Sequence, residues 1–256
     1  QHFWYCDPYF RAAFDMNQGG AVIDLRPYAA KLETEAGIGT KHIQDVSYPF
    51  LIQANYRAGY FTHYAGEGTI KSCKVSYGGV EADLCLCRTK AHFSEEGETR
   101  ALTLDPVELK LGGLTAVVQT VYRFTEGSSE IEVNRTVLSV SIPGAKLKFS
   151  EYMTACYGTT EYSEDMTGIT LSVSAPGKTV SIDYAYKCRE AALEHAQAAS
   201  AVIPQIQTKV TVACRSEARG FIREGYAFSP MFTLGMEAEI GEKETLTTWL
   251  RLEKAN

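Results

Sequence analysis

The chain has 256 residues, of which 45% are hydrophobic and 22% are charged, a composition typical of a globular protein that is long enough to bury a substantial core. Its net charge is −6 and it contains no basic run, which argues against nucleic acid or an anionic membrane surface as a partner. No apolar run approaches the ~18 residues that a membrane helix needs, so no membrane partner is expected.

The predicted elements are almost all strands. Residues 10–14 and 21–25 are expected to pair across a Gly-Gly turn, and the segment 26–40 after them is less regular. Further runs rich in β-branched and aromatic residues alternate with turns over residues 68–77, 80–90, 101–109, 114–124, 130–140, 147–153, 168–173, 179–186, 208–213, 229–237 and 244–252. About a dozen short strands at this spacing predict an all-β sandwich or barrel.

The clearest of these elements is a hairpin in residues 119–140, QTVYRFTEGSSEIEVNRTVLSV. Its turn is the Glu-Gly-Ser-Ser cluster. With those four residues as the loop, Phe124 lies opposite Ile131 and Arg123 lies opposite Glu132. This register places apolar side chains on one face and an ion pair on the other, which cross-strand pairing favours.

One helix is predicted, near residues 189–202 (REAALEHAQAASAV), because this segment is dense in Ala, Glu and Gln and ends before Pro204. We expect it to connect two strands and to lie across a sheet. No repeat and no low-complexity linker divides the chain, so residues 1–256 are predicted to form a single domain.

Several segments together resemble the galactose mutarotase-like β-supersandwich, a fold of aldose epimerases and of accessory domains of glycoside hydrolases, phosphorylases and polysaccharide lyases. Residues 9–15 (YFRAAFD) and 19–25 (GGAVIDL) resemble its opening hairpin. Residues 121–137 (VYRFTEGSSEIEVNRTV) are similar to a hairpin found in the middle of many members, and residues 234–252 to the closing hairpin. The resemblance spans nearly the whole chain and implies a large antiparallel β-sandwich.

The resemblance implies a carbohydrate-binding or carbohydrate-processing protein that holds a small sugar or an oligosaccharide on the concave face of a sheet and needs no cofactor. Two alternatives stay open: a non-catalytic structural or accessory domain of a larger glycoside-processing enzyme, and an aldose 1-epimerase-like mutarotase. Enzymes of the family use an acid His and a base Glu in short motifs. Neither His-Gly-x-x-Arg nor His-x-Tyr-Phe occurs in this chain, so no catalytic residue is carried over, and enzyme activity related to epimerases, hydrolases or lyases stays an open question.

The candidate site residues come from two segments. In residues 56–64 (YRAGYFTHY), a His is surrounded by rings on which a sugar can stack and lies close to an Arg. Glu151 is the best candidate among the carboxylates for a base or for a group that holds sugar hydroxyls. We therefore predict His63 and Glu151 as catalytic residues, and Arg57, Tyr60, Tyr64 and Tyr152 as substrate-binding residues.

The seven cysteines are scattered and odd in number, which favours reduced thiols and a cytoplasmic protein. The alternative is a secreted or periplasmic protein whose signal peptide has been removed. Cys85 and Cys87 are not followed by further ligands at suitable spacing, so no metal site is predicted. Because the chain begins with Gln1, we expect that a signal or tag was removed or that the chain is one domain of a longer gene product.

Overall fold

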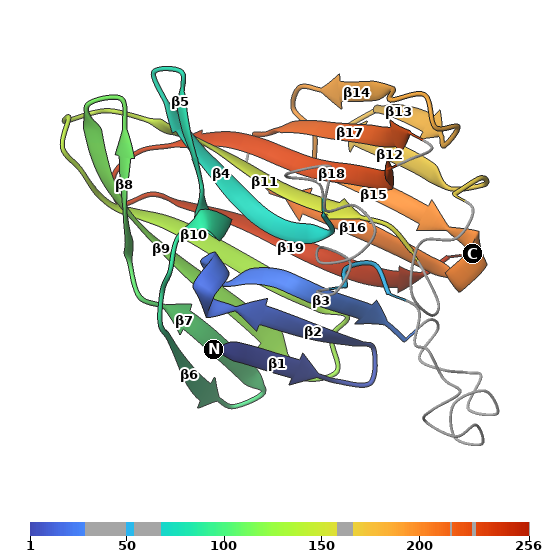
Figure 1. Cartoon of the computed structure of the whole chain (residues 1–256), viewed down its shortest axis with the longest axis horizontal. Helices are drawn as coiled ribbons and strands as arrows, with labels where there is room; N and C mark the ends of the chain where they lie inside the picture. The colour runs from blue at the N-terminus through green and yellow to red at the C-terminus, as the bar shows by residue number, and fades with distance from the viewer. Residues whose placement is uncertain (29–49, 54–67, 158–165, 216, 227–228, 256) are drawn as a thin grey trace.

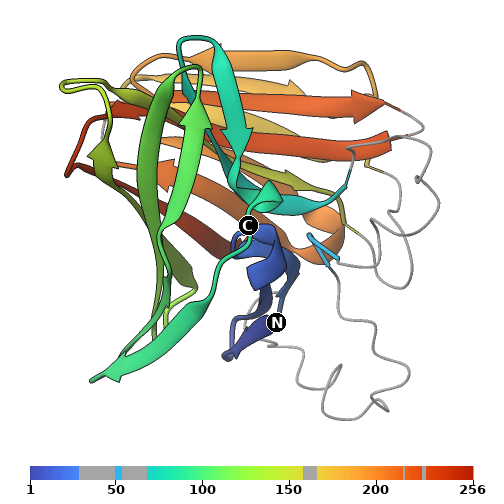
Figure 2. The same cartoon turned by 60° about the vertical axis from the view of Figure 1, so that its left-hand side comes forward.

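The structure, a computed structural model, describes residues 1–28, 50–53, 68–157, 166–215, 217–226 and 229–255. In these residues nearly all regular structure is antiparallel β, and the strands form two large sheets that pack face to face (Figures 1 and 2). The predicted all-β antiparallel sandwich is therefore confirmed. None of the helices in the described residues is long and apolar enough to cross a membrane.

The first sheet is nine-stranded and runs in the order β1 (His2–Cys6), β2 (Phe10–Asp15), β3 (Ala21–Pro27), β4 (Ile70–Tyr77), β11 (Leu147–Ala155), β18 (Ser229–Ile240), β17 (Arg219–Tyr226) and β14 (Glu190–Leu193), with β5 (Val80–Asp83) paired to β4. The second sheet is ten-stranded and runs in the order β13 (Lys178–Asp183), β12 (Thr170–Ala175), β15 (Ala198–Ile203), β16 (Thr208–Cys214), β19 (Thr245–Lys254), β10 (Glu130–Val140), β9 (Leu114–Thr125), β7 (Thr99–Leu104) and β6 (Ala91–Glu96), with β8 (Val107–Leu111) paired to β9.

A continuous apolar core fills the space between the sheets. Along β9 and β11 every second side chain is buried, as expected where one face of a sheet packs against another. Aromatic rings fill one end of the core, where Tyr5 stacks on Phe124 with ring centroids 4.2 Å apart and Phe14 contacts Tyr122 at 4.7 Å. None of the seven cysteines is part of a disulfide.

The predicted hairpin is confirmed in its register. Strands β9 and β10 pair with Phe124 opposite Ile131 and Arg123 opposite Glu132. The Phe124 and Ile131 side chains are buried in the core. Glu132, however, accepts a hydrogen bond of 2.7 Å from Asn134 Nδ2 on its own strand, and it forms no ion pair with Arg123 among the described contacts.

The helix predicted near residues 189–202 is wrong. This segment forms strands β14 and β15, joined by a turn in which His195 has the left-handed φ of 56°. Along β15 the buried side chains alternate with half-buried ones, with Ala199 and Ala201 turned into the core. Helix propensity is a weak preference of a few tenths of a kcal/mol per residue, and burial of one face of a strand outweighs it here.

The strands predicted over residues 80–90 and 101–109 are each interrupted. Strand β5 ends at Asp83, whose carboxylate caps the short 3-10 helix η4 (Leu84–Leu86), and Leu86 is consequently 83% exposed. Pro106 separates β7 from β8, because proline has no N–H for the ladder of hydrogen bonds.

Candidate ligand-binding site

A cavity of about 890 Å³ lies on the face of the first sheet that is turned away from the second sheet. Strands β4, β11, β18, β17 and β14 supply its floor, and β5 with η4 supplies one wall. Because alternate residues of a strand share a face, the register of these strands decides which side chains meet in the cavity. The side chains that reach the cavity form three rows across the sheet.

The middle row gives the cavity an aromatic floor. It runs through Ala192, Phe221, Gly235, Tyr152 and Ser72, each opposite the next on the neighbouring strand. The ring of Phe221 lies over Gly235, where a Cβ atom would come within 2.1 Å of Phe221 Cζ. Glycine at this position therefore makes room for the ring, as glycines in strands do where another group approaches closely.

Tyr152 lines the cavity and is held by Asp83. Its hydroxyl donates a hydrogen bond of 2.6 Å to Asp83 Oδ2, while Asp83 Oδ1 accepts from Ser72 Oγ and from the Cys85 N–H, both at 3.0 Å. Burial, together with the hydrogen bond and charge of Asp83, raises the pKa of Tyr152 well above its ordinary value. Because the phenolic proton is committed to Asp83, the Tyr152 oxygen is left to accept a hydrogen bond from a ligand.

The second row is polar and runs from β14 to β11. Glu190 lies opposite Arg223, Arg223 opposite Thr233, and Thr233 opposite Thr154. The two threonine hydroxyls are hydrogen-bonded at 3.1 Å. Glu190 and Arg223 are both exposed to the cavity, and neither forms an ion pair within the described residues.

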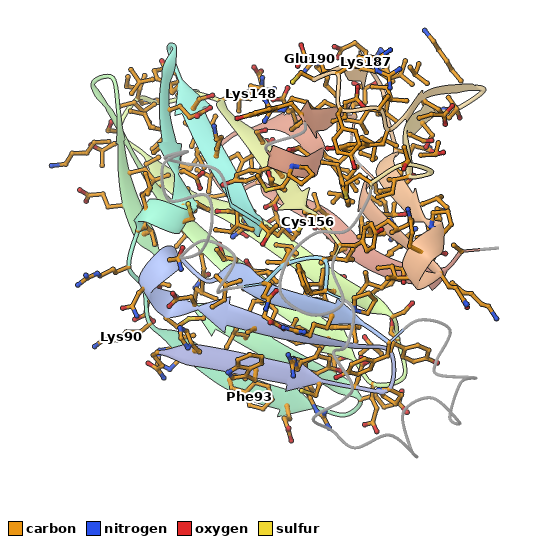
Figure 3. All side chains as sticks on the ribbon, turned by 45° about the vertical axis from the view of Figure 1, so that its right-hand side comes forward. Lys90, Phe93, Lys148, Cys156, Lys187 and Glu190 are labelled. Atoms are coloured by element: carbon orange, nitrogen blue, oxygen red, sulfur yellow. The ribbon has the colours of Figure 1, made fainter. Side chains whose placement is uncertain are left out.

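The third row consists of charged side chains that are paired with one another. Glu237 Oε2 lies 2.9 Å from both Arg219 Nη1 and Lys148 Nζ, and Lys74 Nζ lies 2.8 Å from Glu81 Oε1. Burial opposes the charge of Glu237, but the hydrogen bonds from Lys148 and Arg219 outweigh it and lower its pKa. Figure 3 shows the Lys148 and Glu190 side chains toward the same upper edge of the molecule.

Glu224 anchors a loop that forms one end of the cavity. Its buried carboxylate accepts hydrogen bonds from the N–H groups of Ala185, Lys187 and Arg189 at 2.6, 3.1 and 3.3 Å, and from Arg189 Nε at 2.6 Å. Burial opposes its charge, but these donors outweigh it and lower the pKa of Glu224 to about 2. The anchored loop places Cys188, which has a left-handed φ of 53°, on the cavity wall.

Glu151 lies on the other side of the same sheet. Neighbouring residues of β11 point in opposite directions, so Tyr152 reaches the cavity whereas Glu151 is 0% exposed between the sheets. Glu151 Oε1 lies 2.5 Å from Arg135 Nε, and Oε2 lies 2.7 Å from Lys71 Nζ. Burial opposes the charge of Glu151, but these cations outweigh it and lower its pKa to about 2.

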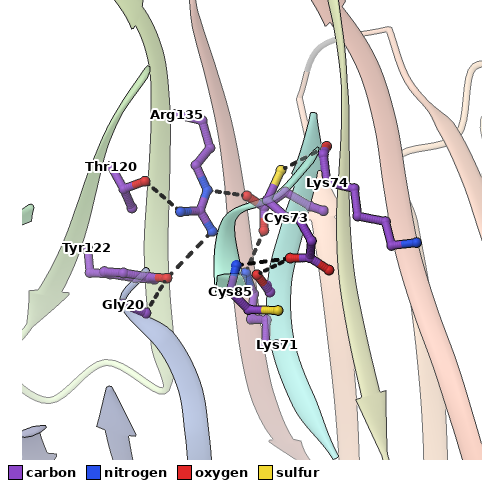
Figure 4. Close-up of polar contacts among 11 residues, drawn as sticks. Gly20, Lys71, Cys73, Lys74, Cys85, Thr120, Tyr122 and Arg135 are labelled. Carbon is purple, nitrogen blue, oxygen red and sulfur yellow. Dashed lines mark hydrogen bonds and ion pairs between the residues drawn. The ribbon is translucent and has the colours of Figure 1, made fainter. Parts of the chain in front are cut away.

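Arg135 crosses from the second sheet to reach Glu151. Its Nη1 donates to Thr120 Oγ1 at 2.6 Å and its Nη2 to Tyr122 Oη at 3.5 Å, so every side of the guanidinium has a partner (Figure 4). We call Lys71, Arg135 and Glu151 the buried charge cluster. It connects the two sheets and does not line the cavity.

Of the residues predicted from sequence, Tyr152 lines the cavity and Glu151 lies behind its floor. The other predicted site residues, His63, Arg57, Tyr60 and Tyr64, lie outside the described residues. Sequence reasoning missed Phe221, Gly235, Asp83, Arg223 and Glu190. The sequence signal that could have found them is the alternation of faces along a strand. It already places Tyr152 on one face of its strand and Glu151 on the other.

No protein-family model matches the chain, and no curated protein sequence does. Solved structures match over almost the entire chain. A galactose mutarotase-like protein from Clostridium acetobutylicum aligns with a TM-score of 0.60 at 9% identity, over 100% of this chain and 95% of that one. The chain has the galactose mutarotase-like fold. A galactose mutarotase-related enzyme from Lactobacillus acidophilus aligns with a TM-score of 0.61 at 7% identity, over 100% of this chain and 98% of that one.

The same galactose mutarotase-like fold also occurs within larger enzymes. The α-N-acetylgalactosaminidase of Bifidobacterium bifidum, solved with N-acetylgalactosamine, aligns with a TM-score of 0.61 at 9% identity, over 99% of this chain but 36% of that one. The names of these neighbours all concern carbohydrates, and at such low identities the likeness establishes the fold alone.

Proposed function

We propose that the protein binds a carbohydrate in the cavity of the first sheet. The observation that carries this proposal is the Phe221 ring over Gly235, in the same row as Tyr152 and between two rows of polar side chains. A sugar ring has an apolar C–H face and a rim of hydroxyls. An aromatic floor with polar groups along both of its sides matches that distribution.

The polar groups offer the hydroxyls both kinds of partner. The Tyr152 oxygen accepts, because its own proton is held by Asp83. Thr154 and Thr233 share one hydrogen bond and keep a further donor and acceptors for a ligand. A volume of about 890 Å³ is within the range of ligand sites, which is roughly 300–1,000 Å³, and exceeds the needs of one monosaccharide. The proposal needs no cofactor.

The names of the structural neighbours support a carbohydrate as the ligand class, since they are mutarotase-like proteins and a glycosidase solved with a sugar. Two further proposals come from the sequence: one concerns catalysis, and the other concerns a role as a domain of a larger enzyme. His63, predicted from sequence as a catalytic residue together with Glu151, is proposed for acid–base chemistry of the aldose 1-epimerase type. Arg57, Tyr60 and Tyr64 are proposed to bind the substrate. An accessory role inside a larger glycoside-processing enzyme is the alternative, since one neighbour is such an enzyme.

Saturation-transfer NMR with free aldoses, uronic acids and short oligosaccharides tests the proposal. We expect transfer to the ring C–H protons of at least one sugar. Replacing Phe221 with Ala is expected to weaken that binding roughly 5- to 30-fold, which corresponds to the loss of about 1–2 kcal/mol from one stacking contact. The matched control is Phe93→Ala, which removes a ring that is 46% exposed on β6 of the second sheet and should leave the binding unchanged.

Silence across the whole panel, or an equal loss in both variants, would contradict the proposal. The same spectra report exchange between anomers. Exchange above the buffer rate that disappears in His63→Ala would establish the epimerase alternative, whereas binding without exchange would indicate a binding or accessory role.

Replacing Gly235 with Ala is expected to weaken sugar binding about as much as Phe221→Ala does, roughly 5- to 30-fold, while the protein stays folded. The new Cβ atom would occupy the space of the outer end of the Phe221 ring, and this end of the side chain is able to swing away. The ring would then no longer cover the floor. Circular dichroism should match that of the parent protein, while the affinity for the sugar measured by saturation transfer falls as in Phe221→Ala. Gly241→Ala, at a position where the nearest atom to a Cβ is 3.7 Å away, serves as the control.

A further inference from the structure

The charges around the cavity are unevenly divided. Its described lining contains the cationic residues Lys74, Arg219 and Arg223, and a larger number of carboxylates. A ligand that carries a carboxylate or phosphate needs an unpaired cation, for which a guanidinium is well suited because it binds two oxygens at once. Which of these cations is available therefore decides whether an anionic ligand fits.

Two of the cations are already neutralised. Lys74 Nζ lies 2.8 Å from Glu81 Oε1, and Arg219 Nη1 lies 2.9 Å from Glu237 Oε2. Arg219 Nε is also 3.3 Å from Glu194 Oε1. An anionic ligand would have to displace a carboxylate to bind either side chain.

Arg223 is the remaining cation, and it forms no ion pair within the described residues, but a carboxylate, that of Glu190, stands on the neighbouring strand. The two residues lie directly opposite each other on β17 and β14, and both side chains line the cavity. Directly opposed side chains on an antiparallel pair have Cβ atoms about 4.5–5.5 Å apart. The Glu190 carboxylate thus stands beside the position that an anion bound to Arg223 would occupy. Asp83, on the opposite wall, adds a second negative charge whose hydrogen-bond donors are all uncharged.

We infer that Glu190 determines the charge of the ligand, so that the cavity accepts uncharged sugars and rejects sugars that carry a carboxylate or phosphate. This inference rests on the proposed function. The reason is electrostatic: Glu190 and Arg223 together carry no net charge, so Glu190 repels the anion that Arg223 would attract, and Asp83 adds to that repulsion. Without Glu190, the guanidinium of Arg223 becomes the natural partner of an anionic group in the cavity.

The test compares glucose with glucuronate and galactose with galacturonate, pairs that differ at C6, at low ionic strength where charge effects are least screened. In the parent protein we expect the neutral sugar to bind more tightly than its uronate. Glu190→Gln should shift this ratio toward the uronate by roughly twofold to fivefold, the range for one exposed charge pair, and Glu190→Lys should shift it further. Glu253→Gln, the same change of charge on β19 of the second sheet, should leave the ratio unchanged.

A readout that does not depend on sugar separates this inference from the proposed function. Titration with inorganic phosphate should move the Arg223 Nε–Hε NMR signal in Glu190→Gln and not in the parent protein. If no sugar binds but this signal moves as expected, the proposed function fails while the role of Glu190 in excluding anions stands. A parent protein that binds uronates as tightly as neutral sugars, or a Glu190→Gln variant with an unchanged ratio and an unmoved Arg223 signal, would overturn the inference.

Discussion

Replacing Glu151 with Ala is expected to lower the free energy of unfolding by about 3–5 kcal/mol, the cost of removing one partner from a buried ion pair. The carboxylate is fully buried and lies 2.5 Å from Arg135 Nε and 2.7 Å from Lys71 Nζ. Its removal would leave both cations between the sheets without a counter-charge. Arg135→Ala should have a similar effect, because it leaves Thr120, Tyr122 and half of the Glu151 carboxylate without their donor.

Urea denaturation of the parent and variant proteins measures this effect. Glu253→Ala is the control, because the exposed pair of Glu253 with Lys209 is worth at most about 1 kcal/mol. Replacing the whole buried charge cluster at once, as Lys71→Met, Arg135→Met and Glu151→Leu, should restore most of the lost stability, since no unpaired charge then remains. A Glu151→Ala variant with unchanged stability and lost sugar binding would instead favour the catalytic role predicted from sequence.

The protein is expected to lose stability steeply as the pH falls below about 4.5. Glu151 and Glu224 both have a pKa lowered from the ordinary 4.5 to about 2 by their cationic and hydrogen-bonding partners. Above pH 4.5 each is ionised in the folded and the unfolded chain, and its contribution to stability is complete. Between 4.5 and 2 the unfolded chain takes up protons that the folded protein does not, so stability falls. Below 2 the contribution is gone.

Each of these carboxylates adds a slope of up to about 1.4 kcal/mol per pH unit to the acid side of the stability profile. Urea midpoints measured between pH 7 and pH 3 give that slope. Glu224→Gln should lower stability at pH 7 by about 1.5–3 kcal/mol, because the amide cannot match a charged acceptor of backbone N–H groups and of Arg189. The variant should also lose stability less steeply below pH 4.5, by up to about 1.4 kcal/mol per pH unit, because one proton fewer is taken up on unfolding. If stability falls with pH equally steeply in the variant and the parent, Glu224 does not contribute to the acid sensitivity of the protein.

The hairpin of β9 and β10 was predictable because local features define it completely. A four-residue turn fixes the loop, and the alternation of apolar residues then selects one register, in which Phe124 faces Ile131. The segment at residues 189–202 was not predictable from composition, because its alanines favour a helix and only their burial in the core selects a strand. Ala199 and Ala201 are small residues turned into a core that only the other sheet reveals.

Strand β17 was missed entirely, and with it a central part of the cavity floor. Its sequence, RGFIREGY, contains two glycines and three charged residues, which individually disfavour strands. The meeting of Phe221 with Gly235 and of Arg223 with Glu190 also depends on which strands are neighbours, and this is decided by contacts between segments distant in sequence. Glu151 and Tyr152 were grouped because they are adjacent in sequence, although adjacent residues of a strand face opposite ways.

The buried charge cluster also bears on how the chain reaches and leaves its folded state. Lys71, Glu151 and Arg135 come from β4, β11 and β10, so the cluster needs both sheets to be formed and closed upon each other. We expect such contacts to be made after the rate-limiting step of folding. Interactions of this kind slow unfolding and leave the folding rate almost unchanged. The ion pairs of the buried charge cluster are therefore expected to lower the unfolding rate. They lengthen the lifetime of the native protein more than they speed up its formation.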